Sequence, residues 1–261
     1  MRVRSQYLLF GLVTLAFLIS YFFPGVSNND TIQTSISFIG ILFGIIIGFF
    51  ITDLYTRFHA IRSNAAIDSS CLTTYFSFCN IILSENANHK KWFETQRELI
   101  YNYVKKFIPL PWEKYEKTEK EFSEIVNSLQ DLKYKTDKEN ETYSNMLSVI
   151  SQHSDAREKL VMYGKDTLSK GEWMVILSLG GLLLASLFYV KDASLASTIF
   201  TGSISSSILL LLFVVRDLNN LNFGESSVSI GPYERVLEAI GKPKFYADKF
   251  KDRRFKIINK K

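Results

Sequence analysis

The chain has 261 residues, a mean hydropathy of +0.05, 22% charged residues and a formal net charge of +5. Its charges are unevenly distributed, because four stretches, 7–29, 31–52, 173–190 and 193–215, contain no Asp, Glu, Lys or Arg. A helix that crosses a bilayer needs about 20 predominantly apolar residues. This pattern therefore excludes a plain soluble enzyme, a disulfide-rich secreted domain and a disordered chain.

The first charge-free stretch predicts a membrane helix over residues 7–23 that stops at Pro24 and Gly25. Arg2 and Arg4 before an apolar run also fit a cleavable signal peptide, which is the alternative. The apolar run is long for a signal peptide and no small-residue cleavage site follows it, so a retained helix is favoured.

The second stretch predicts a membrane helix over residues 35–51, in which glycines recur at every fourth position. Small residues with this spacing let helices approach closely in lipid. Beside them runs an apolar stripe, which has two interpretations: ordinary helix packing, or a hydrophobic constriction that gates ions by dewetting in an oligomer. The glycines are Gly40, Gly44 and Gly48, and the stripe is Ile39, Phe43 and Ile47.

Residues 53–172 are predicted to form an all-helical bundle. They contain no glycine before Gly164, and their prolines are Pro109 and Pro111, which is typical of long helices interrupted once. We expect helices at about 51–83, 91–107 and 112–134, and a fourth that runs from about residue 142 into the third membrane span. Arg57 and Arg62, just after the second span, are interpreted either as interfacial anchors or as a ring that attracts anions to a pore entrance.

The third and fourth membrane helices are predicted at 173–190 and 195–215. The fourth carries hydroxyl groups at spacings of four, three and four, at Ser194, Thr198, Thr201 and Ser205. Hydroxyls of this kind either bond to the carbonyl of residue i−4 in their own helix or line a wet path and donate to a permeating anion. No acidic residue lies inside any predicted span, which argues against proton-coupled or cation transport.

Lys and Arg residues set the expected topology. They flank the spans at the N-terminus, in 53–172 and in the tail 216–261, and are nearly absent from the two short connections. The sequence therefore predicts an all-α protein of the cell membrane, with four transmembrane helices and a long helical cytoplasmic insertion between the second and third. We expect four segments, 1–52, 53–172, 173–215 and 216–261, and both termini in the cytoplasm. The last segment is a basic tail, in which Pro232 and Gly241 predict the start and end of a short helix that docks on the bundle.

The excess positive charge flanks the spans, so its expected partner is the anionic inner leaflet and not a nucleic acid. Catalytic motifs are missing: the three histidines are isolated, and no nucleotide-binding loop, nucleophile elbow or paired Cys/His ligand spacing occurs. We therefore expect no enzyme activity, no catalytic or metal-binding residue and no cofactor.

Three segments carry a resemblance to a known family. They are the glycine-rich run from Gly40 to Phe50 that leads into Arg57, the Glu172-Trp173 entry to the third span, and the tail from Tyr233 to Tyr246. Together with the order of the predicted helices, they resemble the bestrophin-like family of small membrane proteins. Bestrophins proper are pentameric anion channels with a hydrophobic neck on the second helix. The resemblance implies that Phe43, with Ile39 and Ile47, matches that neck.

Two functions follow as hypotheses. The first is an oligomeric membrane channel that conducts small anions passively, with second spans from several subunits around the pore. The alternative is a non-conducting scaffold or sensor, whose cytoplasmic bundle binds a partner and whose glycine face serves only dimerisation.

Overall fold

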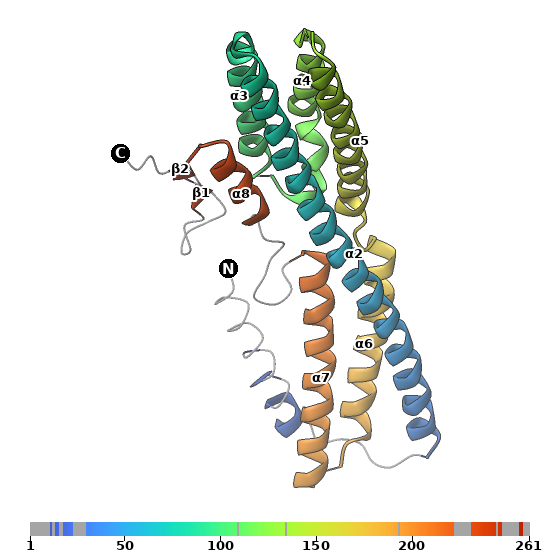
Figure 1. Ribbon diagram of the computed structural model, residues 1–261. Helices are drawn as coiled ribbons and strands as arrows, with labels where there is room; N and C mark the ends of the chain where they lie inside the picture. The colour runs from blue at the N-terminus through green and yellow to red at the C-terminus, as the bar shows by residue number, and fades with distance from the viewer. Residues whose placement is uncertain are drawn as a thin grey trace. The chain divides into compact units, whose positions relative to one another are not determined.

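The computed structural model describes residues 11, 14, 15, 18–22, 30–108, 110–133, 135–192, 194–221, 231–243, 245, 246, 256 and 257. Over these residues the fold is helical, as predicted, except for a two-residue antiparallel pair, β1 (Phe245–Tyr246) with β2 (Lys256–Ile257) (Figure 1). The long helices are α2 (Asp30–Glu85), α3 (Lys90–Phe107), α4 (Glu119–Ser128), α5 (Asp137–Lys165), α6 (Lys170–Val190), α7 (Leu195–Asn219) and α8 (Gly231–Ala239). Short 3-10 turns, η1 (Ala87–His89), η2 (Trp112–Thr118) and η3 (Leu129–Asp131), connect them.

The chain divides into two compact units, each built from two separate parts of the sequence. Unit 1 comprises residues 1–58 and 167–227, and unit 2 comprises residues 59–166 and 228–261. Helix α2 contributes its first half to unit 1 and its second half to unit 2. The segment after the last long apolar helix therefore divides between the units, and α8 belongs with the helical insertion.

Unit 1 contains the apolar helices. Among the described residues, three helices are long and apolar enough to cross a membrane: Thr34–Glu85, Lys170–Val190 and Leu195–Asn219. The first has 52 residues where a span needs about 20, and its charge-free part, up to residue 52, is by itself long enough to cross a bilayer. The expected span at 7–23 lies largely outside the described residues, although residues 18–22 are helical. The chain is thus a membrane protein with several candidate spans.

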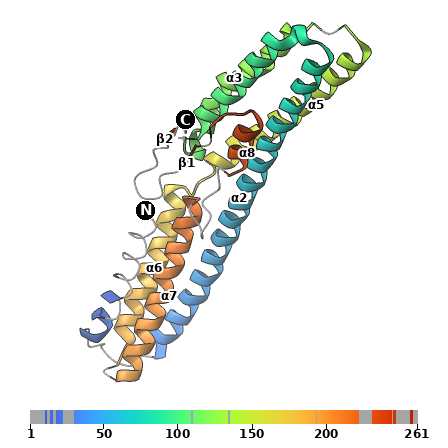
Figure 2. The same cartoon turned by 60° about the vertical axis from the view of Figure 1, so that its left-hand side comes forward.

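Capping chemistry sets where α6 and α7 begin. Ser169 and Glu172 form a reciprocal capping box at the start of α6, and the Ser194 side chain accepts a hydrogen bond from the backbone N–H of Ser197 at the start of α7. The two helices run side by side, next to the first half of α2 (Figure 2). The predicted fourth helix of the insertion does not continue into the third span, because α5 ends at Lys165 and Ser169 caps a new helix.

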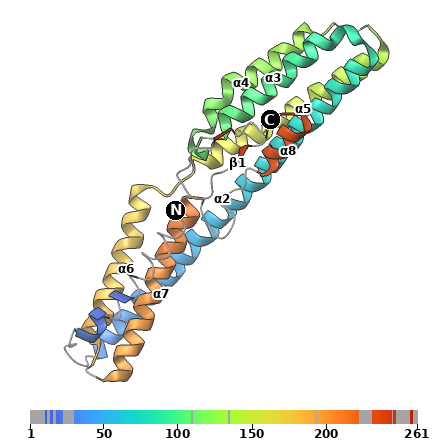
Figure 3. The ribbon, with the colours of Figure 1, turned by 90° about the vertical axis from the view of Figure 1, so that its left-hand side faces the viewer.

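Unit 2 packs the second half of α2 with α3, α4, α5 and α8 (Figure 3). Helix α3 matches the expected 91–107 closely. The expected 112–134 helix is shorter, since its first turns are the 3-10 segment η2 and α4 ends at Ser128. Helix α5 starts at Asp137 and not near residue 142, because Thr136 and Glu139 form a capping box.

Helix α8 ends in a motif that requires a left-handed residue. Gly241 has φ of +66°, and the backbone N–H groups of Gly241 and Lys242 donate to the carbonyls of Glu238 and Leu237. This is the Schellman pattern, for which glycine has no Cβ penalty. The Arg97 side chain on α3 also donates to the carbonyl of Ile240 (2.6 Å), which ties the end of α8 to α3.

Candidate functional site

The two faces of the membrane part of α2 differ in burial. Phe43 and Ile47 are 4% and 3% exposed. The Phe43 ring lies against α6, because a Cβ added to Gly180 would sit 3.4 Å from Phe43 Cε2. Ile39 is half-buried. The residues predicted as the constriction therefore pack largely inside their own subunit.

The three glycines of α2 also differ. A Cβ at Gly40 would lie 3.9 Å from Leu183 of α6, whereas a Cβ at Gly44 or Gly48 would have no neighbour within 4 Å among the residues that the structure describes. Only Gly40 therefore lies next to another described helix of the same chain. Gly44 and Gly48 leave an open, narrow strip along α2, which a second helix could approach closely.

Bulky apolar side chains flank this open strip. Ile41, Ile45 and Phe49 are 64%, 66% and 70% exposed and follow one another at four-residue intervals. Sequence reasoning missed them because residues 38–51 are all apolar or glycine, so no polar face indicates which side of the helix is buried. Their four-residue spacing is the same as that of the buried stripe.

The hydroxyl groups predicted on α7 do not form one open stripe. Ser194 caps the helix, and the Thr198 hydroxyl donates to the Ser194 carbonyl (3.1 Å). Thr201 and Ser205 are buried, and Ser205 Oγ has no hydrogen-bond partner within the described part of the chain. In the single chain, therefore, Thr201 and Ser205 face the interior of unit 1.

The two arginines predicted at a pore entrance have different surroundings. Arg57 is 2% exposed, and its Nη1 donates to the backbone carbonyl of Asn219 (3.0 Å) at the end of α7. The Asn219 side chain in turn accepts from the backbone N–H of Leu168 (2.8 Å). A cation at a helix C-terminus is favourable there because of the helix dipole. Arg62, on the unit 2 part of α2, is exposed.

Unit 2 contains a buried polar cluster around Asp68, which sequence reasoning did not find. Asp68 is 0% exposed, and its carboxylate accepts hydrogen bonds from three tyrosine hydroxyls, of which two are short: Tyr115 (2.9 Å) and Tyr233 (2.7 Å). The third, Tyr103, lies 3.2 Å from Oδ1, and His153 Nε2 lies 2.8 Å from the same oxygen. The donors come from four elements: α3, η2, α5 and α8.

Electrostatics favours an ionised Asp68 and neutral tyrosines in this cluster. Burial alone would raise the pKa of Asp68, but the neighbouring His153 and the tyrosine hydrogen bonds outweigh it, so the pKa lies below its ordinary value. Burial raises the pKa of Tyr115 and Tyr233 well above the usual range, with a further contribution from the Asp68 charge. The tyrosines are therefore neutral donors to an ionised carboxylate at neutral pH.

Arg157 extends the cluster towards the surface. Its Nη1 donates to the hydroxyls of Tyr103 (2.7 Å) and Thr118 (2.8 Å), and its Nη2 lies 2.9 Å from Glu119 Oε2. The Asp68 carboxylate, the three tyrosine hydroxyls and Arg157 are thus joined by hydrogen bonds in the interior of unit 2. The arrangement is that of a structural network that joins α2, α3, η2, α5 and α8.

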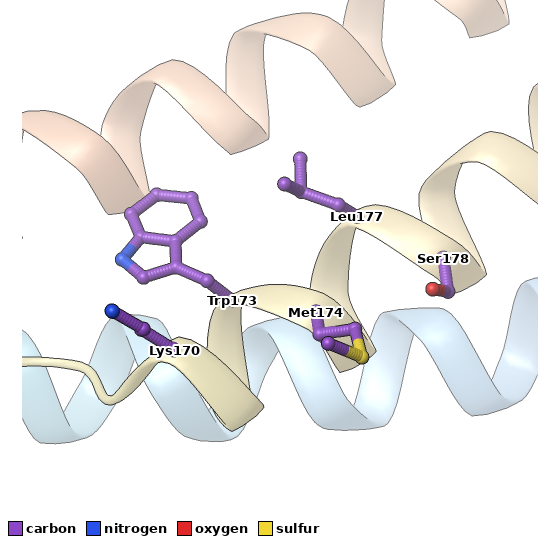
Figure 4. Close-up of a pocket in the computed structure, with 5 residues that line it drawn as sticks. All are labelled: Lys170, Trp173, Met174, Leu177 and Ser178. Carbon is purple, nitrogen blue, oxygen red and sulfur yellow. The ribbon is translucent and has the colours of Figure 1, made fainter.

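A shallow hollow lies on α6 at the start of its apolar stretch. Lys170, Trp173, Met174, Leu177 and Ser178 line it, with Lys170 and Trp173 at one end and Ser178 at the other (Figure 4). An indole beside a lysine where an apolar helix begins is typical of a membrane–water interface. The hollow contains no pair of groups that could act as acid and base.

Known proteins share this architecture. The bestrophin-like domain family matches the chain over residues 7–233. A point mutant of a bacterial bestrophin homolog from Klebsiella pneumoniae is similar in structure, with a TM-score of 0.69 and 13% identity over 90% of this chain and 99% of that chain. A mutant membrane protein has a TM-score of 0.68 and 14% identity over 89% and 98% of the two chains. At these identities the likeness concerns the fold alone. No curated protein matches the sequence.

Proposed function

The chain belongs to the bestrophin-like family, and from that premise we propose that it assembles as a homo-oligomeric channel through which small anions cross the membrane passively. One observation carries the proposal: the bilayer part of α2 exposes a row of bulky apolar residues, Ile41, Ile45 and Phe49, beside the open glycines. A shared pore is lined by residues at the subunit surface. Bulky apolar side chains from several subunits can form a constriction that gates by dewetting.

We propose that the constriction lies on the exposed face of α2. Phe43 and Ile47 are buried against their own subunit, so we assign them to the packing of α2 in unit 1. Ile41, Ile45 and Phe49 take the pore-facing role in the proposed oligomer. Gly44 and Gly48 then let neighbouring α2 helices come close enough for these side chains to narrow the path.

Charge supports anions as the permeating species. No acidic side chain lies at 34–52, 173–190 or 195–215, so a cation would meet no compensating charge there. Arg62, exposed on α2 beyond the bilayer part, is proposed to attract anions, while Arg57 holds the end of α7. From the distribution of Lys and Arg we propose that unit 2 and both termini lie in the cytoplasm.

The alternative is a non-conducting scaffold, and the open glycine strip favours it equally. A dimer that packs at Gly44 and Gly48 would bury the strip without forming a pore. In that case Gly44→Leu should abolish dimers, because the added side chain blocks close helix approach, while the protein still folds. A channel requires more than two subunits around a common axis, so subunit number separates the two functions.

The test is ion flux in liposomes that contain the purified protein, with subunit number measured in detergent. We expect chloride flux that exceeds sodium flux, and a several-fold higher chloride flux for Ile45→Ala. Met174→Ala is the matched control, because Met174 is also exposed (68%) but lies on α6. An oligomer that passes no anion under any ionic condition would overturn the channel and leave the scaffold.

A further inference from the structure

Lys170, the first residue of helix α6, forms no ion pair within the described part of the chain. Five other described lysines each pair with a glutamate: Lys106, Lys120, Lys138, Lys165 and Lys242. Glu172, the acidic residue of α6, instead accepts a hydrogen bond from the backbone N–H of Ser169 (2.6 Å) in the capping box. The ammonium group of Lys170 can therefore bind an anion from outside the chain.

The exposed side chains of α6 change in character from the start of the helix towards its middle. Lys170 and Trp173 lie at one end of the shallow hollow on this helix (Figure 4). Met174 and Leu177, which follow, are 68% and 54% exposed. One turn further on, a Cβ added to Gly181 would have no neighbour within 4 Å among the described residues, so the helix surface is open there too. A cation and an indole are thus followed by a surface without charged side chains over the rest of the helix.

The length of this surface matches one leaflet of a bilayer. The charge-free part of α6 begins at Trp173, and a tryptophan beside a lysine is typical of the membrane–water interface. At about 1.5 Å per residue, the helix rises about 15 Å from Trp173 to Leu183, which is half of a hydrocarbon core of roughly 30 Å. This places Lys170 at the level of the lipid phosphate groups, and Leu177 at the level of the acyl chains of the same leaflet.

We propose that the hollow on α6 is a binding site for one phospholipid with a net negative head group, whose phosphate is bound by Lys170 and whose acyl chain lies against Leu177. Lysine binds phosphate as a point charge, and one lysine near a membrane surface favours anionic lipid by about five-fold. The Trp173 indole suits the boundary between the two parts of the lipid, because it has an apolar ring and a polar N–H. The site lies within unit 1, and it is separate from conduction, so it holds for a channel and for a scaffold alike.

An anionic phospholipid matches the hollow better than other occupants do. Phosphate in solution could pair with Lys170, but it would leave the apolar part of the hollow uncovered. An acidic protein segment would have to bring its backbone to the level of the acyl chains, where unpaired N–H and C=O groups are costly. A zwitterionic lipid carries a positive group together with its phosphate, so Lys170 favours it less.

Quenching of the Trp173 fluorescence tests the site in the full-length protein in detergent micelles. Phosphatidylglycerol and phosphatidylcholine with brominated acyl chains quench an indole that they contact. The signal of Trp173 is obtained by subtracting that of Trp173→Phe, which retains Trp92 and Trp112 in unit 2. We expect brominated phosphatidylglycerol to reach half-maximal quenching at a mole fraction about five-fold lower than brominated phosphatidylcholine.

Substitution of the lysine distinguishes a binding site from general contact with lipid. Lys170→Gln should remove the preference for phosphatidylglycerol, whereas Lys170→Arg should keep it because arginine retains the charge. Lys117→Gln, at an exposed lysine on η2, is the matched control and should also keep the preference. The midpoint of thermal unfolding should be the same in all these forms, since both lysines are exposed.

The proposed site would be wrong under each of the following results. Equal quenching by the two lipids in the unsubstituted protein would mean that Trp173 contacts only bulk lipid. A preference that persists in Lys170→Gln would mean that Lys170 does not bind the head group. Loss of the preference on addition of soluble glycerol phosphate would assign Lys170 to a soluble phosphate compound and not to a lipid.

Discussion

The hydroxyl of Tyr233 donates a 2.7 Å hydrogen bond to Oδ2 of Asp68, although 165 residues separate the two in the chain. The bond joins helix α8 to the second half of α2. Both side chains are completely buried, and the Tyr233 ring lies 4.6 Å from that of Phe107. Helix α8 is therefore part of the core of unit 2 and not an appendage.

We predict that Tyr233→Phe destabilises unit 2 by about 1.5–3 kcal/mol, the range for a hydrogen bond to a charged group. The Asp68 carboxylate loses one donor in a site that water does not reach. Denaturant unfolding in detergent measures the change. Tyr189→Phe, at an exposed tyrosine on α6, is the control and should leave the midpoint unchanged. Equal effects of the two substitutions would contradict the role of the bond.

The pH dependence of stability should report Asp68 directly. The pKa of Asp68 in the folded protein lies below its ordinary value, whereas an aspartate in the unfolded chain has a pKa of about 3.9. The carboxylate therefore contributes stability at neutral pH, and that contribution is lost as pH falls from about 4 through the folded pKa. Asp68→Asn should be less stable than the unsubstituted protein at pH 7, and the difference should shrink at acid pH. A difference that stays constant down to pH 2 would contradict this account.

Gly164 near the end of α5 has no room for a side chain. A Cβ there would lie 2.4 Å from the backbone oxygen of Trp112, so η2 would have to move. We predict that Gly164→Ala costs about 1–3 kcal/mol or more, as overpacking does. At Gly171 in α6 the nearest atom would be Ser169 Oγ at 3.8 Å, so Gly171→Ala should be neutral or mildly stabilising. Thermal unfolding measures the stability of both variants. A Gly164→Ala variant as stable as the unsubstituted protein would contradict this prediction and show that η2 can move at little cost.

Truncation of Phe43 and truncation of Ile45 should have different effects on the stability of the subunit. Phe43→Ala leaves a cavity against α6 and should cost about 3–5 kcal/mol of stability. Ile45 is 66% exposed in the single chain, so Ile45→Ala should leave folding of the subunit nearly unchanged. Protease resistance and thermal unfolding of the two variants measure this. The reverse order of stabilities would mean that the buried face of α2 is wrongly assigned.

Local chemistry in the sequence was enough to predict several helices. In α8, Pro232 near the start, apolar residues at helical spacing and Gly241 as the left-handed end residue all act within a few positions of one another. The start of α5 was predicted five residues too late, although Thr136 and Glu139 carry the capping-box pattern. Residues 135–141 are all polar, a composition that by itself indicates a link between helices.

Other features depend on contacts that no sequence pattern contains. The donors to Asp68 lie 35 to 165 residues away, and each tyrosine by itself fits an apolar helix face. In the membrane part of α2 both faces are apolar, so periodicity predicts a helix but not which stripe is buried. The choice between Phe43 and Ile45 is decided by packing against Gly180, which lies on another helix.

Chloride efflux from liposomes that contain the purified protein tests the proposed function most directly, with Ile45→Ala and Met174→Ala measured beside the unsubstituted protein. The proposal predicts efflux that depends on the protein, exceeds sodium efflux, rises several-fold in Ile45→Ala and is unchanged in Met174→Ala. Oligomeric protein that gives no efflux above protein-free liposomes, in all three forms, would contradict it.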